Sequence, residues 1–276
     1  MRKHCVMHTL ADSEASRSKR QDAYLWRFCA TLLSYGMFGL GGLVLGLLVF
    51  PVMQCLPSTP DVRRRRARRI LQVALRTLIS AMRRMGALTY DVQGAERLGR
   101  PGQMIVANHP SLIDVVFLIA FSPGAGCVVK QSMWRNPVTR GTALAAAYVP
   151  NQPTDAMIDL ATQALESQQS VIIFPEGTRT IPGQPLRFHR GAASIAVKAA
   201  TIVTPVFIRC EPTTLTKSTP WYRIPDRRVH ISMHVGEDID PAPFRGSAIP
   251  LASRTFNSHL LGVITAGLVT RERTAP

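Results

Sequence analysis

The pattern of apolar and polar positions changes at Gly86. Beyond this residue, short apolar runs alternate with segments whose apolar residues recur at helical spacing. This alternation predicts an α/β fold, in which a mostly parallel or mixed sheet is covered by helices on both faces. The predicted strands are Leu88–Val92, Gln103–Ala107, Cys127–Lys130, Tyr148–Val149, Val171–Phe174, Ile202–Ile208 and Val229–Val235. The predicted helices are Leu112–Phe121, Val138–Ala147, Thr154–Ser167 and Ala192–Ala200.

A long uncharged stretch precedes this domain. No charged residue occurs from Phe28 to Pro60, and the core of the stretch, Thr31 to Met53, exceeds the roughly 20 residues that a membrane-spanning helix needs. The apolar run begins too late for a cleavable signal peptide, and no A-x-A-like site follows it. We therefore expect a polar basic tail (1–27), a membrane-inserted segment (28–60), a basic helix (61–85) and the α/β domain (86–276).

The orientation of the inserted segment stays open. Basic residues flank it on both sides, so a single span would place one basic flank outside, against the usual bias. A bent, re-entrant or hairpin insertion would leave both flanks at the cytoplasmic surface, facing anionic lipid. Glycines within the segment and Pro51 near its end favour the second arrangement.

Residues 61–85 predict an amphipathic helix. Its apolar positions recur at helical spacing, and arginines cover the other face. Such a helix suits a membrane surface, and the alternative is an ordinary helix packed on the domain. The adjoining apolar segment favours the membrane. The expected apolar face consists of Ile70, Val73, Ala74, Leu78 and Met82.

Composition adds a strong positive charge. The chain has 33 Lys+Arg against 17 Asp+Glu, a net charge of +16. This favours anionic partners, which could be nucleic acid, anionic lipid or acidic ligands. The main arginine cluster adjoins the apolar segment and is not interleaved with aromatic residues, so a lipid surface is favoured and nucleic acid is not expected.

No metal or disulfide framework is expected. The five cysteines are scattered without a CxxC pair. His230 and His234, on one predicted strand, would lie about 13 Å apart and could not share an ion. We expect no cofactor.

Two polar loops follow apolar strands. In such sheets ligands bind beyond the carboxyl ends of the strands. The first loop, Asn108–Asp114, has the sequence NHPSLID. Ser111 and Asp114 have the spacing of a helix-capping pair, and this explains Asp114 without a function. The same placement lets Asp114 accept a hydrogen bond from His109, fixing the tautomer of a general base.

The second loop, Pro175–Thr180, has the sequence PEGTRT. Gly177 permits positive φ or close approach to a ligand, and Arg179 offers a planar fork suited to phosphate. Glu176 could hold that fork or bind a hydroxyl. A tight turn with a surface ion pair is the alternative.

Together, NHPSLID and FPEGTRT resemble the glycerophospholipid (1-acylglycerol-3-phosphate) acyltransferase family. Leu186–Gly191 and Val203–Val206 extend the similarity over roughly residues 85–240. The resemblance implies an αβ acyltransferase domain, an acyl-CoA or acyl-carrier-protein donor, a lysolipid acceptor and a cytoplasmic-face membrane location. It implies His109 and Asp114 as the catalytic pair, with Glu176, Gly177, Thr178 and Arg179 binding the acceptor. Further substrate contacts are expected from Asn108, Ser111, Lys130 and Arg190.

One difference from the family's sequence pattern concerns recognition of the acceptor. Where the family has a Gly-x-Phe-x-x-Arg block, this chain has Ala146–Asn151, which contains no arginine. Lys130, Arg140 or Arg190 could compensate and preserve recognition of 1-acylglycerol-3-phosphate. Otherwise the acceptor is a lyso-aminolipid or glycolipid. A basic, non-catalytic membrane or nucleic-acid-binding protein is the third, less favoured hypothesis.

Overall fold

The computed structural model describes residues 24–272 except 153, 218 and 221, so most of the expected basic tail lies outside the described residues. Within them a seven-stranded sheet has the order β1-β7-β6-β2-β5-β3-β4. Neighbouring strands are parallel, except that β6 and β7 are antiparallel. The strands are β1 (Leu88–Gln93), β2 (Gln103–Ala107), β3 (Gly126–Val129), β4 (Val149–Pro150), β5 (Val171–Ile173), β6 (Ile202–Glu211) and β7 (Val229–Val235).

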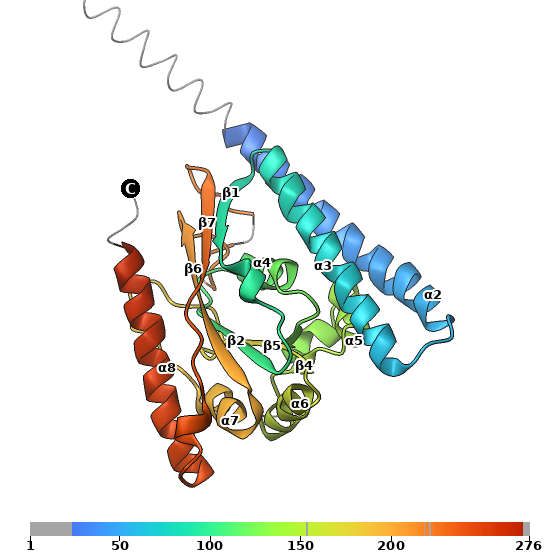
Figure 1. The fold of residues 1–276 in the computed structure, drawn as a ribbon. Helices are drawn as coiled ribbons and strands as arrows, with labels where there is room; N and C mark the ends of the chain where they lie inside the picture. Colours follow the sequence, from blue (N-terminus) through green and yellow to red (C-terminus); the bar gives the residue numbers. More distant parts are fainter. Residues whose placement is uncertain (1–23, 153, 218, 221, 273–276) are drawn as a thin grey trace, which may run out of the picture.

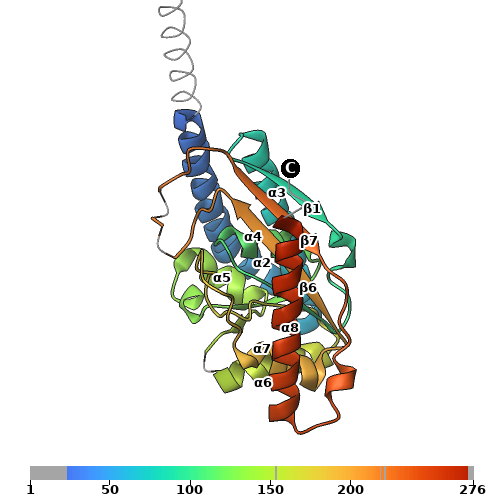
Figure 2. The same ribbon diagram turned by 90° about the vertical axis from the view of Figure 1, so that its left-hand side faces the viewer.

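Helices cover both faces of the sheet (Figures 1 and 2). One core cluster joins the sheet to the first set of helices, which are α3 (Pro60–Arg84), α4 (Ile113–Phe121) and α5 (Pro137–Ala145). A second cluster joins it to α6 (Thr154–Glu166), α7 (Arg190–Ala199) and α8 (Ile249–Glu272). All five residues of β2 are buried, because helices lie on both sides of it. The predicted α/β fold is confirmed.

One large element was not predicted. Helix α8 packs against α7 and β6 through Phe256, Leu260 and Ile264, which are fully buried. Their spacing of four residues is helical, so the pattern was present in the sequence. The signal is weak because Leu261 and Val263 add apolar residues outside this stripe, which blurs the one-sided pattern.

Most of the uncharged N-terminal segment lies in one continuous helix, Tyr24–Gln54, which has a π-helical turn at Leu45–Val49 followed by α2 (Phe50–Gln54). Among the described residues it is the one helix long and apolar enough to cross a membrane. The chain turns near the end of the 28–60 segment, between α2 and α3, and α3 returns beside the helix (Figure 1).

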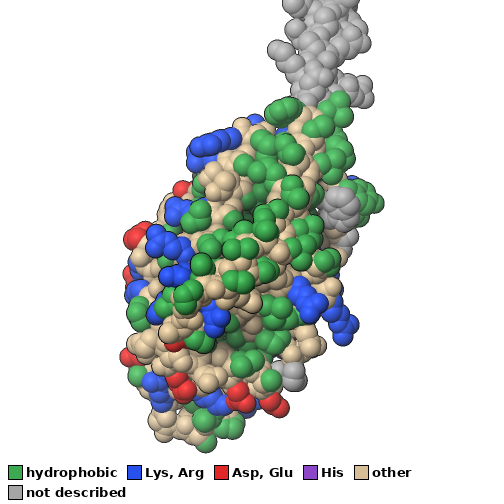
Figure 3. Space-filling view, turned by 90° about the vertical axis from the view of Figure 1, so that its right-hand side faces the viewer, with side chains coloured by type: hydrophobic (Ala, Val, Ile, Leu, Met, Phe, Trp, Pro, Cys, Tyr) green, Lys and Arg blue, Asp and Glu red, His purple; other side chains and the backbone are tan. Residues whose placement is uncertain are grey.

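This helix, which we call the N-terminal helix, contacts the domain along its length. Near its start, the Trp26 indole donates to the carbonyl of Met85 at the end of α3. Near its end, Phe50 and Met53 pack against Ala67. At the crossing with α5, Gly46 lies so close to Gly141 that a Cβ on either residue would crowd the partner's backbone. Opposite this packed stripe, apolar side chains remain exposed (Figure 3).

The apolar face expected for residues 61–85 was only partly right. Leu78 and Met82 are buried, but Val73 is 57% exposed. The buried stripe consists of Ala67, Leu71, Leu75, Leu78, Ile79 and Met82. This stripe packs on α4 and the sheet, so the helix is bound to the domain. Its other faces carry exposed arginines.

Arg68 departs from the expected basic surface. Its side chain is buried and donates to the carbonyls of Ala146 (2.8 Å) and Gly124 (3.2 Å). Burial lowers the pKa of this guanidinium to about 10. Arg68 therefore binds the end of α5 to the turn before β3 instead of facing lipid.

Candidate functional site

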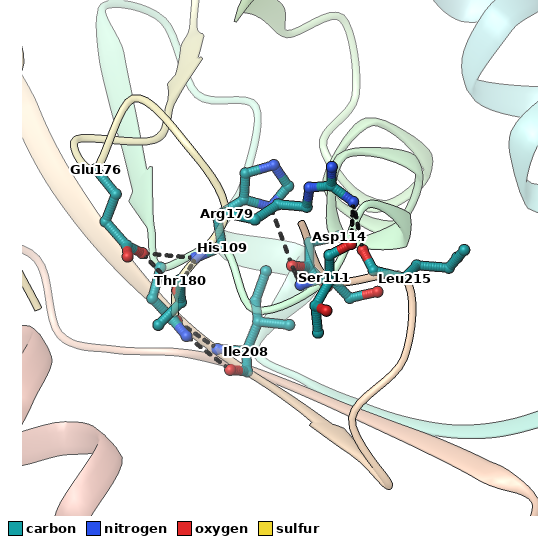
Figure 4. A network of polar contacts seen from close by, with 10 residues as sticks. His109, Ser111, Asp114, Glu176, Arg179, Thr180, Ile208 and Leu215 are labelled. Atoms are coloured by element: carbon teal, nitrogen blue, oxygen red, sulfur yellow. Dashed lines mark hydrogen bonds and ion pairs between the residues drawn. The ribbon is translucent and has the colours of Figure 1, made fainter. Parts of the chain in front are cut away.

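The two polar loops meet at one edge of the sheet. Strands β2 and β5 are neighbours and run parallel, so the 108–114 loop and the 175–180 loop leave from the same end. Figure 4 shows side chains of both loops converging on His109. The prediction that they open into one crevice agrees with this geometry, since the carboxyl ends of adjacent parallel strands lie side by side.

His109 and Asp114 are in direct contact. His109 Nδ1 lies 3.1 Å from Asp114 Oδ2, and the carboxylate is fully buried. Because a carboxylate accepts, this contact places the proton on Nδ1 and leaves Nε2 able to take a proton from a substrate. The imidazole also stacks on Phe174, with ring centroids 4.2 Å apart. The ring is thus fixed at one edge and on one face.

Asp114 serves the helix end as well. Its Oδ2 accepts the backbone N–H of Ser111 at 2.6 Å, whereas the Ser111 hydroxyl makes no cap. One oxygen therefore serves both roles that the sequence left open. Burial raises the pKa of Asp114, and the hydrogen bond and charge of His109 and the N–H of Ser111 oppose that rise.

Glu176 points toward the backbone of His109. Its Oε1 accepts the His109 N–H at 2.9 Å and the Thr180 hydroxyl at 2.7 Å. Burial raises the pKa of this carboxyl, and both hydrogen bonds oppose the rise. Gly177, at φ +64°, turns the loop in a conformation that glycine favours, and Thr178 is exposed.

Arg179 is partly engaged. Its Nη1 donates to the carbonyls of Leu215 (2.7 Å) and Thr216 (2.8 Å) in the β6–β7 connection. The carbonyl of Leu215 also accepts the N–H of Leu112, at 3.3 Å. The connection is thereby joined to both polar loops. Both bonds use Nη1, and in the described part of the chain no hydrogen bond engages the Nε–Nη2 edge of the guanidinium.

Three other residues were expected to contact the substrate, namely Asn108, Lys130 and Arg190, and among the described residues their side chains make no hydrogen bond to His109 or Asp114. The Asn108 amide donates to the carbonyl of Ile208 and accepts its N–H, both at 2.8 Å, so Asn108 joins β2 to β6. Lys130, exposed, follows β3, and Arg190, exposed, begins α7 beside Arg254. In the described part of the chain, no hydrogen bond or ion pair joins the side chain of Lys130 or Arg190 to the two polar loops.

An apolar cavity of about 170 Å³ adjoins the site. Its lining includes Leu112 and Ile113, which lie next to Asp114 in the chain, and Leu215. Its walls come from the N-terminal helix, α3, α4 and the β6–β7 connection. A smaller cavity of about 110 Å³ lies beneath the same helix and shares Phe38, Leu78 and Val116 with the first. No local sequence signal marked these walls, because they come from distant segments.

The two buried cysteines, Cys210 and Cys127, are not activated as nucleophiles. Burial raises the pKa of Cys210 to about 11, and that of Cys127 to about 12, so both remain thiols near neutral pH. His230 and His234 contact different residues, Thr89 and Gln93. Among the described residues, no three His, Cys, Asp or Glu side chains gather as a metal site would require.

The α/β sheet, with the His109–Asp114 pair at the carboxyl ends of its strands, fits the class of the acyltransferases, which the two loop sequences resemble. Comparisons support this class: the family model described as Acyltransferase matches residues 89–209. The 1-acyl-sn-glycerol-3-phosphate acyltransferase of Pseudomonas aeruginosa is 32% identical over 183 residues, covering 64% of this chain and 69% of that protein. The human alpha enzyme of the same name is 27% identical over 194 residues, covering 66% and 65%. The chain belongs to the 1-acylglycerol-3-phosphate acyltransferase family.

A solved structure has the same fold. The crystal structure of the 1-acyl-sn-glycerophosphate acyltransferase PlsC from Thermotoga maritima matches with a TM-score of 0.67, over 88% of this chain and 96% of that one. Identity is 20%. The match extends well beyond residues 89–209, so the shared fold includes elements on both sides of the family segment.

Proposed function

We propose that this enzyme transfers a fatty acyl group from acyl-CoA or acyl-carrier protein to the free hydroxyl of 1-acylglycerol-3-phosphate, with His109 as general base. The observation that carries the proposal is the His109–Asp114 pair, whose Nδ1 is held by a buried carboxylate next to an apolar cavity. The names of the relatives support the acceptor.

The reaction follows from this geometry. His109 Nε2 takes the proton of the acceptor hydroxyl while the oxygen attacks the thioester carbonyl carbon. The C–O bond forms, the C–S bond breaks, and the imidazolium returns the proton to the leaving thiolate. The leaving group is good, since a thiol has a pKa of about 8.5. The difficult step is activating the alcohol, for which a positioned base contributes typically about 10²–10⁴-fold.

The cavity beside the site suits a hydrocarbon chain. Its walls are apolar side chains for the most part, and they include Leu112 and Ile113, which lie next to Asp114 in the chain. A chain placed there would be removed from water, with its reacting end at the two polar loops. This supports a long-chain acyl substrate over a small acyl group.

The acceptor headgroup is assigned to the 175–180 loop. Arg179 presents its Nε–Nη2 edge, and the lack of a Cβ at Gly177 lets the loop pack against the His189 ring. A different lysolipid remains the second candidate, because Asn151 stands where the family has an arginine. The side-chain Oδ1 of Asn151 accepts the N–H of Gln131 and thereby joins the end of β4 to the segment after β3. In an acceptor competition, the native enzyme should prefer lysophosphatidate to a lyso-aminolipid. The opposite preference would favour the second candidate.

Arg179→Lys should raise the acceptor KM by about 10- to 100-fold, because an ammonium group cannot reproduce the planar fork and a hydrogen bond to a charged group is worth about 1.5–3 kcal/mol. The donor KM should change much less. Steady-state kinetics with each substrate varied would test this, with Arg135→Lys, an exposed arginine, as the matched control. Equal increases in both KM values would show that Arg179 acts only by holding the β6–β7 connection.

We also propose attachment at the cytoplasmic face of the membrane, with the N-terminal helix lying along the surface. One side of that helix is packed on α3 and α5, and the exposed side is apolar. A helix bound lengthwise to a polar domain cannot cross the bilayer without drawing the domain in. Exposed arginines of α3 lie on the neighbouring surface and suit anionic headgroups.

Replacing Leu33, Leu40 and Leu47 by glutamine should weaken binding to vesicles by more than about 100-fold, since each buried leucine contributes about 1.5–3 kcal/mol. These residues are 56%, 66% and 73% exposed, so packing on the domain is spared. Deleting the whole helix would be a poorer test, because it would remove Phe50 and uncover Ala67 and both cavities.

The matched control replaces three exposed residues of α6 and α8, Leu160, Leu251 and Val269, by glutamine. Flotation with anionic and neutral vesicles measures the effect. The remaining attraction of the variant should need anionic lipid and weaken with salt, because exposed charges are screened over about 8 Å at physiological ionic strength. Unchanged binding of the leucine variant would contradict the proposed surface.

A further inference from the structure

Thr180 holds the backbone of His109 from two directions. The Thr180 N–H donates to the carbonyl of His109 at 2.7 Å. The His109 N–H in turn points at the Thr180 hydroxyl oxygen (3.2 Å) as well as at Glu176 Oε1 (2.9 Å). Both main-chain polar groups of His109 are therefore bound by the 175–180 loop (Figure 4).

The hydroxyl proton of Thr180 has a defined place. It is directed to Glu176 Oε1, 2.7 Å away, so a lone pair of the same oxygen is left for the His109 N–H. A hydroxyl has one proton and two lone pairs, which makes these two roles compatible. Branching at Cβ restricts the rotamers of threonine and so favours one orientation of this hydroxyl. Thr180, Glu176 and the His109 backbone form a closed ring of hydrogen bonds.

We propose that Thr180 is a positioning residue for His109, with Glu176 as the second member of the same clamp. Asp114 fixes the Nδ1 edge of the imidazole, and Phe174 fixes one ring face. Neither determines where the main chain of residue 109 lies, and the clamp does. Displacement of a reacting group by about 1 Å can cost on the order of 10²-fold in rate. The inference rests on the proposed role of His109 as general base.

The experiment compares Thr180→Val with Thr180→Ser. Valine has nearly the shape of threonine but cannot bind Glu176 or His109 through its side chain, whereas serine keeps the hydroxyl. Thr180→Val should lower kcat by about 10- to 100-fold with little change in either KM, and Thr180→Ser should retain most of the activity. Thr255→Val on α8 is the matched control, since the exposed Thr255 hydroxyl bonds only within its own helix, to Leu251.

A second readout does not depend on the substrate. Imidazole NMR of the native chain and of the variants, with His109→Ala to assign the signals, should show that Thr180→Val shifts the His109 resonances while Thr180→Ser and Thr255→Val leave them in place. Native kcat in Thr180→Val would overturn the inference, as would a lost kcat that serine does not restore. If the native enzyme fails to use lysophosphatidate, the acceptor assignment fails, whereas the NMR comparison still decides the role of Thr180.

Discussion

His109→Ala should reduce acyl transfer by at least about 10²-fold, because it removes the proposed general base. Folding should be little affected, since the imidazole lies at the edge of the core with its side chain 12% exposed. Initial rates with long-chain acyl-CoA and lysophosphatidate, together with thermal melting, measure both effects.

His230→Ala is the matched control for this change. His230 is an exposed histidine of β7 whose ring contacts Thr89, so its loss should leave the rate unchanged. If His109→Ala kept near-normal turnover while remaining folded, the general-base mechanism would be wrong.

Asp114→Asn should also lower the rate strongly, by about 10- to 10³-fold, because an amide can hold the wrong tautomer of His109. The melting temperature, by contrast, should not fall. An amide oxygen can still accept the N–H of Ser111, and it carries no charge into the buried site. The variant should therefore melt at the native temperature or above it.

Ionisation of Asp114 should make the stability of the folded chain depend on pH. Burial raises the pKa of Asp114 above its ordinary value of 3.8 in the folded state. The folded chain then binds the proton more tightly than the unfolded chain, so ionisation of Asp114 lowers the free energy of unfolding as pH rises from about 3.8 through the folded pKa. Asp114→Asn should lack this contribution. An active variant with a lowered melting temperature would instead show that Asp114 only caps α4.

Strand and loop positions were largely contained in the sequence. The segment Gln103–Ala107, which is apolar after its first residue, matches β2, because a strand buried on both faces needs a run of apolar residues. Parallel pairing then places the loops after β2 and β5 at one edge, and it was this rule that predicted a common site for His109 and Glu176. The contact between His109 and Asp114 could be expected from their five-residue spacing, because the start of α4 turns the Asp114 side chain back toward His109.

Contacts between distant segments were not predictable in this way. Asn108 was expected to bind substrate, yet its amide is held by Ile208, a residue 100 positions away. Arg179 is engaged by Leu215 and Thr216, which no motif marks. Whether a polar side chain is free for a ligand depends on which backbone groups the fold brings to it, and local spacing does not carry that information.

The sequence by itself determined the α/β class, the two polar loops and the His109–Asp114 pair, because periodicity and helix capping are local effects. Only the tertiary structure decided that the N-terminal helix packs lengthwise on the domain, that Arg68 is buried, and that Thr180 binds the backbone of His109. Each of these depends on packing or hydrogen bonding across tens of residues. Their free energies come from surfaces and polar groups that become neighbours only when the chain has folded.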